Sequence, residues 1–312
     1  MKCSFCHEKS VYEVKYNGSA LCGKHLTQYV ERRVKQEVRQ QLNVGSRKTR
    51  VSVAISGGKD SSVTLHLLHK ILSERRNIEL SAFTVDEGIE GYRSAGLSAA
   101  RSLSNKLGIP HETISYKESF GYTMDEIVSA DGGRTIPCAH CGPMRRQLMN
   151  RVSDYQKGDY VALGINLDDY AQSIMMNVAK GDVKRMARMA PHTKSQDGLV
   201  PRVLPLRKIP EKEVMLYAVV NGIEFEGGWC PYYAQANRNK FRSIVSDLEN
   251  ENPGTKFAIV NFLDTIRNSL DTSFPPSELG KCKKCGSPTA SELCVVCSDL
   301  EELQKIMENN SG

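Results

Sequence analysis

The chain has 312 residues, of which 40% are hydrophobic and 25% charged, with a formal net charge of +6 at pH 7. It contains no apolar run near the roughly 20 residues that cross a bilayer, and its first six residues lack the apolar core of a signal peptide. We therefore expect a cytoplasmic protein with no membrane partner, whose ten cysteines bind metal rather than form disulfides.

The first 25 residues carry four potential metal ligands in two pairs. Cys3 and Cys6 form a C-x-x-C pair, and Cys22 and His25 form a C-x-x-H pair. Alternating apolar residues on either side of Asn17-Gly18 predict a β-hairpin between the pairs. Two ligand pairs joined by a hairpin are typical of a small zinc module, so we predict a first zinc site here.

A helix is predicted at residues 24–42, because apolar residues recur there at helical spacing. Its opposite face carries four cations: Arg32, Arg33, Lys35 and Arg39. Two interpretations stay open, a contact with RNA and an ordinary solvated helix face. Residues 43–49 are polar and are predicted to be a linker.

The stretch from Val51 to Ser62 combines a short apolar strand, two glycines and the start of a helical pattern. A Gly-Gly turn lets the backbone approach an anion closely, and the following helix start offers unpaired N–H groups. Ser56, Lys59 and Ser61 add a charge and two hydroxyls. The stretch is therefore predicted to bind phosphate, although it lacks the Walker pattern G-x-x-x-x-G-K-[ST]. Ser-Gly-Gly-Lys-Asp-Ser instead resembles the PP-loop of the ATP pyrophosphatase superfamily.

Strand and helix patterns alternate from Val51 to about Ile209. Further strands are predicted at residues 78–85, 111–116, 160–165 and 199–206, and helices at residues 92–107 and 211–221. This alternation predicts a doubly wound parallel sheet, whose ligands bind at the carboxyl ends of the strands. The phosphate loop, Asp86 and residues 164–169 are expected at that edge.

Residues 179–208 form the most basic region of the chain. The cations are Lys180, Lys184, Arg185, Arg188, Lys194, Arg202, Arg207 and Lys208. We predict that this region contacts RNA phosphates, with a solvated loop as the alternative. Helices are predicted at residues 239–248 and 253–270, the latter with a proline at its start, and residues 273–277 are predicted to be a linker.

Two C-x-x-C pairs lie near the C-terminus. The four cysteines are Cys282, Cys285, Cys294 and Cys297. This spacing is typical of a zinc ribbon or knuckle, so we predict a second zinc site. A short helix is predicted at residues 301–307.

Three cysteines remain outside the two zinc sets: Cys138, Cys141 and Cys230. Three thiolates can hold a [4Fe–4S] cluster with one iron left open. Alternatively, Cys138 and Cys141 form a redox pair and Cys230 is a nucleophile, or all three are buried structural cysteines. His140 is a possible fourth ligand for zinc, but it lies awkwardly between Cys138 and Cys141.

Together these motifs resemble the TtuA/NcsA group of tRNA uridine 2-thiolation enzymes, within the TtcA-like PP-loop proteins. The resemblance covers nearly the whole chain. Besides the two zinc sets and the phosphate loop, it rests on Pro137-Cys-x-x-Cys141, the segment from Leu163 to Gln172, and Cys230-Pro-Tyr. The chain departs from the family pattern at Ile165, where the family usually has histidine.

The resemblance implies an α/β fold of the PP-loop ATP pyrophosphatase (adenine nucleotide alpha hydrolase-like) class, in which a parallel sheet is flanked by helices. It places small zinc modules at both termini. We expect an N-terminal zinc finger and helix at residues 1–45, a PP-loop catalytic domain at 46–272, and a C-terminal zinc ribbon at 273–312.

The implied reaction is ATP-dependent 2-thiolation of a tRNA uridine. ATP with Mg²⁺ adenylates the C2 oxygen, and sulfur carried on the open iron of a [4Fe–4S] cluster replaces it. The implied catalytic residues are Lys59, Asp60, Asp169, Cys138, Cys141 and Cys230. The implied nucleotide-binding residues are Ala54, Ser56, Gly57, Gly58, Lys59, Asp60, Ser61, Val85, Gly164 and Asp169. Arg145 and Arg146 are expected to hold substrate phosphate, and the zinc modules to grip the tRNA.

The implied partners are tRNA, a second copy of the chain in a homodimer, and a sulfur donor. The donor is either sulfide or a ubiquitin-like thiocarboxylate protein. Members of the group thiolate either the wobble or the T-loop uridine, and the absence of a hyperthermophile's charge enrichment favours the wobble position. Three alternatives stay open: a PP-loop ligase that uses no iron, a persulfide-based sulfurtransferase, and a zinc-ribbon RNA-binding scaffold with a degenerate loop.

Overall fold

A five-stranded parallel sheet forms the centre of the computed structural model, which describes residues 1–192 and 196–311. Its strands are β3 (Thr49–Ala54), β4 (Ile78–Asp86), β5 (His111–Ser115), β6 (Tyr160–Leu163) and β7 (Arg202–Val203), in the order β5-β4-β3-β6-β7. The predicted α/β class is therefore confirmed. The chain runs outward from β3 to β5 and then returns to β6, so the strand order reverses between β3 and β6. Open sheets bind ligands at such a switch point.

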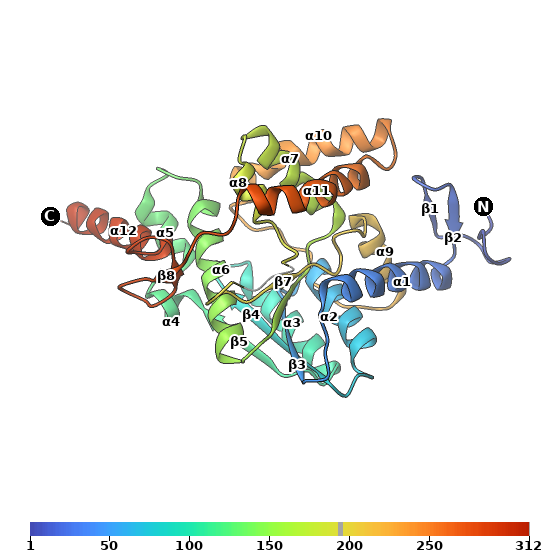
Figure 1. Cartoon of the computed structure of the whole chain (residues 1–312), viewed down its shortest axis with the longest axis horizontal. Helices are drawn as coiled ribbons and strands as arrows, with labels where there is room; N and C mark the ends of the chain where they lie inside the picture. The colour runs from blue at the N-terminus through green and yellow to red at the C-terminus, as the bar shows by residue number, and fades with distance from the viewer. Residues whose placement is uncertain (193–195, 312) are drawn as a thin grey trace.

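Helices cover both faces of this sheet (Figure 1). One face packs against α1 (Gly23–Gln41), α2 (Lys59–Leu72), α3 (Arg93–Lys106) and α9 (Glu211–Val220). On the other face, α4 (Tyr116–Phe120) and α6 (Pro137–Tyr155) pack against the sheet, and α5 (Met124–Asp131) and α12 (Val295–Ser311) pack against α6. On β3, Val51 and Val53 belong to the first core, and on β4 Phe83 belongs to the second. Burial on both faces explains why the strands are so rich in apolar residues.

A further helical layer stands beside the sheet and has a hydrophobic core of its own. It consists of α7 (Leu167–Ala179), α8 (Val183–Ala187), α10 (Arg238–Glu251) and α11 (Thr255–Ser273). Figure 1 shows these helices together above the sheet. Because α10 and α11 pack on α7, segments about 70 residues apart in sequence meet near the carboxyl end of β6.

The two cysteine-rich ends lie at opposite ends of the long axis of the molecule in Figure 1. The N-terminal hairpin joins β1 (Tyr12–Val14) to β2 (Ser19–Leu21), and the C-terminal hairpin joins β8 (Gly280–Lys281) to β9 (Pro288–Thr289). The N-terminal hairpin and α1 share the core of the first sheet face. The helices of the described residues include none that is long and apolar enough to cross a membrane.

The strand predicted at residues 199–206 is much shorter in the structure, where β7 pairs only through Arg202 and Val203. Beyond Val203 the backbone hydrogen bonds to a side chain instead of to a strand. Gln41 of α1 accepts from the N–H of Leu204 at 2.6 Å and donates to its carbonyl oxygen at 3.2 Å. The predicted proline start of the helix at 253–270 is also shifted, because α11 begins at Thr255 after a left-handed Gly254.

Two arginines on the candidate RNA-contacting surfaces pair with acidic residues of packed helices instead. Arg33 is ion-paired with the fully buried Glu213 at 2.8 Å. Arg207 has a 7% exposed side chain and is ion-paired with Glu37 and Asp264, each at 2.6 Å. Both guanidinium groups join packed helices and cannot contact RNA phosphate. Lys194 of the same basic region lies outside the described residues.

Candidate functional site

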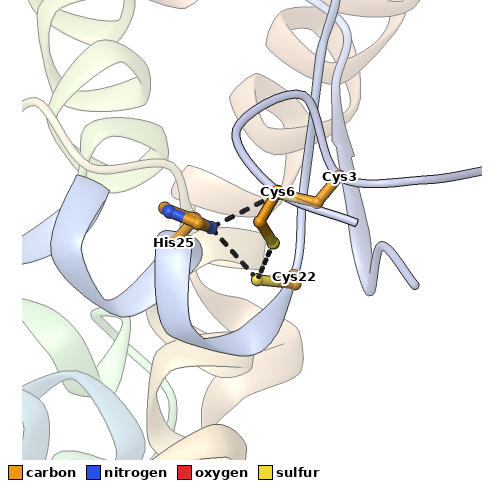
Figure 2. A group of neighbouring side chains, drawn as sticks. All are labelled: Cys3, Cys6, Cys22 and His25. Atoms are coloured by element: carbon orange, nitrogen blue, oxygen red, sulfur yellow. Dashed lines mark hydrogen bonds between the residues drawn. The ribbon is translucent and has the colours of Figure 1, made fainter. Parts of the chain in front are cut away.

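The N-terminal ligand set comes together as a compact cluster. The ligand atoms of Cys3, Cys6, Cys22 and His25 all lie within 4.8 Å of one another. Figure 2 shows the four side chains pointing toward one another, with Cys22 just before α1 and His25 in its first turn, their Sγ and Nδ1 atoms 3.2 Å apart. Burial opposes ionisation of Cys3, but backbone N–H groups of Phe5 and Cys22 lower its pKa to about 6. Three sulfurs and one imidazole fit a closed tetrahedral metal site.

The C-terminal set is equally compact. The sulfurs of Cys282, Cys285, Cys294 and Cys297 lie within 4.8 Å of one another. Backbone N–H groups point at two of these sulfurs, since the N–H of Cys294 donates to Cys282 at 3.3 Å and that of Cys297 to Cys294 at 3.4 Å. Gln147 of α6 donates to Cys285 at 3.3 Å and so ties the module to the helices beside the sheet. Four half-buried or buried sulfurs fit a closed metal site.

The phosphate loop follows β3 and is shaped by close backbone contacts. Gly57 has a left-handed backbone (φ +84°), and a Cβ there would lie 2.0 Å from the carbonyl oxygen of Gly96 in α3. A Cβ on Gly164, just after β6, would lie 2.7 Å from the backbone nitrogen of Ser61. Neither position can hold a larger residue without moving the backbone. The loop is thus held between α3 and the end of β6, at the switch point of the sheet.

Serine side chains fix the loop from inside. The hydroxyl of Ser61 accepts from the N–H of Ser56 at 3.1 Å and donates to the carbonyl of Gly58 at 2.9 Å. The loop therefore keeps its shape without a ligand, and α2 begins at Lys59 directly after it. First-turn N–H groups have no partner within their own helix, so they are available to an anion.

Lys59 lies among carboxylates beside this loop. Its ammonium is 2.9 Å from Asp60 and 3.5 Å from Glu211 of α9. Asn166 donates to Asp60 at 3.0 Å, and its side-chain oxygen accepts from the N–H of Asp169, which caps α7. Burial raises the pKa of Asp169, and the charges of Asp60 and Glu211 raise it further, against the effect of Arg238. Each of the three carboxylates is paired with a cation: Asp60 and Glu211 with Lys59, and Asp169 with Arg238.

The other predicted nucleotide-binding residues lie around the same edge. Ala54 ends β3, and Val85 is buried near the end of β4. The carbonyl of Val85 accepts from the buried Arg93 at 2.8 Å, and Arg93 also donates to the carbonyl of Ser56 at 3.3 Å. One guanidinium thus connects the ends of the two neighbouring strands.

The three remaining cysteines come from two segments that meet beside this edge. Cys138 and Cys141 lie in the first two turns of α6, and Cys230 lies in the loop before a short 3-10 helix, η1 (Tyr233–Gln235). Within the described part of the chain, only the two terminal sets are close enough for a single ion. Burial raises the pKa of Cys230, and so do the neighbouring Cys141 and Cys138. The three sulfurs are not all within 4.8 Å of one another, which leaves a group larger than one ion, such as a four-iron cluster held by three thiolates.

His140 faces away from this centre. It is 4% exposed, and its two ring nitrogens lie 2.7 Å from Asp299 of α12 and 2.7 Å from Thr135. It therefore joins α6 to the C-terminal helix and is not a fourth ligand. The group beside the sulfurs is Arg145 instead, which donates to the sulfur of Cys141 at 3.3 Å.

Glu87 links the cysteine centre to the phosphate loop. Its side chain is 6% exposed and lies 2.9 Å from Arg145 and 2.6 Å from Arg93. Arg93 in turn contacts the phosphate loop at Ser56, and Arg145 contacts Cys141. A continuous polar chain therefore runs from the loop to the cysteines.

Comparison with known proteins agrees with this geometry. Residues 26–248 match the model of the PP-loop domain, and residues 2–27 match that of the N-terminal LIM domain of the 2-thiouridine synthetase TtuA. The tRNA 2-thiolation protein NcsA of Haloferax volcanii is 34% identical over 98% of this chain and 100% of its own length. The chain belongs to the PP-loop family of tRNA 2-thiolation proteins.

Two further relatives in this family differ in the uridine that their names specify. The tRNA-5-methyluridine(54) 2-sulfurtransferase of Pyrococcus horikoshii is 30% identical over 95% of this chain and 93% of its own length. The solved structure of the U34-tRNA thiolase NcsA from Methanococcus maripaludis with its [4Fe-4S] cluster is 36% identical. It superposes with a TM-score of 0.84 over 97% of this chain and 96% of that one.

Some residues of this PP-loop site were not predicted from the sequence. Glu211, Glu87 and Arg93 contact the loop or the cysteine centre, but no local motif contains them. Arg145 was predicted to hold substrate phosphate, whereas in the structure it pairs with Glu87. At Ile165, the departure from the family pattern, the side chain packs on the core of the α7 layer.

Proposed function

We propose that this protein is an ATP-dependent tRNA uridine 2-sulfurtransferase. The observation that carries the proposal is the direct connection between the phosphate loop and the third cysteine. Glu226 pairs with Gly58, and its N–H donates to the carbonyl of Gly57 at 2.8 Å. Cys230 follows only four residues later. A nucleotide on the loop and a sulfur group at the cysteines would therefore be neighbours.

In this proposal the loop and the first turn of α2 hold the ATP phosphates. Lys59 neutralises charge that develops as the C2 oxygen of uridine attacks the α-phosphate and pyrophosphate leaves. Asp169 would contribute one ligand to the Mg²⁺ that ATP brings with its phosphates. The carbonyl oxygen of uridine is a poor leaving group, and attachment of AMP makes its displacement by sulfur feasible.

Cys138, Cys141 and Cys230 would hold a [4Fe–4S] cluster, as the relative from Methanococcus maripaludis supports. Such a cluster would offer an open iron where sulfide from the donor could bind as hydrosulfide, because metal ions lower the pKa of their ligands. Arg145 would compensate the negative charge of the thiolates. The two terminal cysteine sets would each hold one Zn²⁺.

We further propose that the substrate is the wobble uridine. The solved relative whose name specifies U34 is 36% identical, against 30% for the sequence whose name specifies position 54. Cytoplasmic location is supported by relatives named cytoplasmic tRNA 2-thiolation proteins, such as that of Drosophila melanogaster at 34% identity. The homodimer and the sulfur donor stay predictions.

The deciding experiment combines anaerobically reconstituted protein, an unmodified tRNA transcript, ATP with Mg²⁺, and sulfide. We expect one AMP and one pyrophosphate for each 2-thiouridine, which nucleoside mass spectrometry would locate at position 34. Chemical analysis should find about four iron atoms and four acid-labile sulfides per chain. Thiolation by iron-free protein in air would instead support a persulfide on one of the three cysteines. AMP formation without any thiolated nucleoside would support a non-iron ligase.

A further inference from the structure

Trp229 is the single tryptophan of the chain, and it is 61% exposed although it directly precedes Cys230. A lone exposed aromatic residue needs no explanation by itself. This one is different because its ring is held in position. The guanidinium carbon of Arg242 lies 5.5 Å from the ring centroid, and the ring of Tyr233 lies 4.5 Å away at 56°. A fixed ring loses little conformational entropy when a partner covers it.

Trp229 is connected to both halves of the proposed active site. Trp229 is three residues beyond Glu226, which pairs with the phosphate loop at Gly58. Three residues span at most about 11 Å, so the backbone of Trp229 is near the loop and directly precedes the third cysteine. A second connection runs through Arg242, which lies 3.9 Å from Glu211, the carboxylate that contacts Lys59.

The helix beside the ring, α10, carries three cations, of which Arg238 pairs with Asp169 and Arg242 with Glu211. Arg238 and Arg242 of α10 have side chains 47% and 34% exposed, and Lys240 between them is also exposed. Exposed aromatic rings interleaved with arginine are how proteins bind unpaired RNA, because each base offers a flat face and each nucleotide a negative phosphate. An enzyme that reacts at a base must also take that base out of its stack.

We propose that Trp229, fixed by Tyr233 and Arg242, is a stacking platform for the target uridine. Stacking would hold the base between the phosphate loop and the cysteines, with the phosphates of the RNA facing the α10 cations. This inference rests on the proposed thiolation of tRNA and adds to it the subsite that binds the base.

Because Trp229 is the single tryptophan of the chain, the fluorescence of the protein reports directly on binding at this residue. An unmodified tRNA transcript should quench the fluorescence of the protein. A transcript that is abasic at the thiolated position should quench it much less. The variant Trp229→Phe should show no tryptophan signal and should keep most of the thiolation activity, because the flat ring is retained.

The variant Trp229→Leu keeps an apolar side chain but has no flat face. We expect its kcat/KM for thiolation to fall about ten-fold to a hundred-fold, as for loss of one stacked base. ATP binding and the absorbance of the cluster should not change, which would show that Cys230 is still in place. The matched control is Tyr155→Leu, an aromatic 55% exposed at the far end of α6, which should behave as wild type.

The proposal that Trp229 is a stacking platform would be contradicted by a wild-type kcat/KM in Trp229→Leu. It would also be contradicted if the abasic transcript quenched the fluorescence as much as the intact one. Quenching by a ubiquitin-like thiocarboxylate protein and not by RNA would also overturn it and assign the surface to the sulfur donor. A wild-type protein that forms no 2-thiouridine, yet is quenched only by RNA with an intact uridine, would refute the proposed reaction and leave the platform standing.

Discussion

At the scale of single residues, the site depends on charged side chains that are largely buried and fixed by ion pairs. Lys59 is 13% exposed and touches carboxylates from two different helices, Asp60 of α2 and Glu211 of α9. A cation held in this way is positioned before the nucleotide arrives. It therefore needs little reorganisation during the reaction, which is the condition for strong electrostatic stabilisation.

Lys59→Ala should lower the rate of AMP formation about a hundred-fold to a thousand-fold, because it removes the charge beside the transferred phosphate. The measurement is release of AMP from labelled ATP in the presence of tRNA. Zinc content should stay the same. Lys70→Ala is the control, since Lys70 lies on the same helix but is half exposed and paired with Glu31. Normal adenylation by Lys59→Ala would show that the lysine has no catalytic role.

Glu87→Gln tests the buried link between the phosphate loop and the cysteines. The change leaves Arg93 and Arg145 without their shared carboxylate, so the free energy of unfolding should fall by about 3–5 kcal/mol. Urea denaturation would measure this loss. Glu90→Gln is the control, because Glu90 is exposed and close in sequence, and its effect should stay within about 0.5 kcal/mol. Equal stability of the two variants would mean that Glu87 does not compensate these arginines.

At the scale of elements, α6 connects the cysteine centre to the C-terminal module. Its N-terminal turns carry Cys138 and Cys141, and its buried His140 bonds to Asp299 of α12 at 2.7 Å. Gln147, two turns further along, donates to Cys285. The C-terminal module therefore braces the helix that presents two of the three cysteines, in addition to any contact it makes with tRNA.

Replacing Cys294 and Cys297 together by serine should release about one zinc per chain. Affinity for tRNA should fall, while ATP binding should persist because the phosphate loop belongs to other elements. Zinc analysis, tRNA gel shift and nucleotide binding would be measured on the same preparation. The control is Ser298→Ala, because Ser298 directly follows Cys297 in α12 and is exposed. Unchanged affinity for tRNA would limit the module to a structural role.

At the scale of the whole molecule, the fold brings together residues that are distant in the chain. The cysteine centre combines the start of α6 with a loop about 90 residues later in the chain. The phosphate loop follows β3, and Glu211 of α9 contacts Lys59 beside it. The sheet achieves this because parallel strands present all their carboxyl ends at one edge.

Cys230→Ala should remove the absorbance of the cluster and abolish thiolation, because two cysteines on one helix do not replace the third thiolate. Nucleotide binding should remain, since the loop keeps its own serine hydrogen bonds. Visible absorbance, iron content and nucleotide titration would be compared with those of Cys138→Ala and Cys141→Ala, which should behave alike. A Cys230→Ala protein that retained full iron would place this cysteine outside the metal centre.

The sequence by itself determined the features that depend on neighbours a few residues apart. The phosphate loop and the terminal ligand sets are local patterns, and so is the strand–helix alternation that predicts the parallel sheet. These features follow from chain connectivity, because a turn or a C-x-x-C pair has few possible shapes. The family and the fold class were therefore predicted correctly, although β7 was predicted too long because Gln41, distant in sequence, bonds to the backbone of Leu204.

Only the tertiary structure decided which polar residues face inward. Arg33 and Arg207 looked like surface cations by sequence, but buried carboxylates on other helices pair with them. His140 stands between two cysteines in sequence, yet it turns toward α12. Glu87 became part of the site, and so did Trp229 in our proposal, because segments far apart in the chain pack together. Long-range ion pairs depend on which helix faces meet, and the local spacing of residues in the sequence does not predict which faces those are.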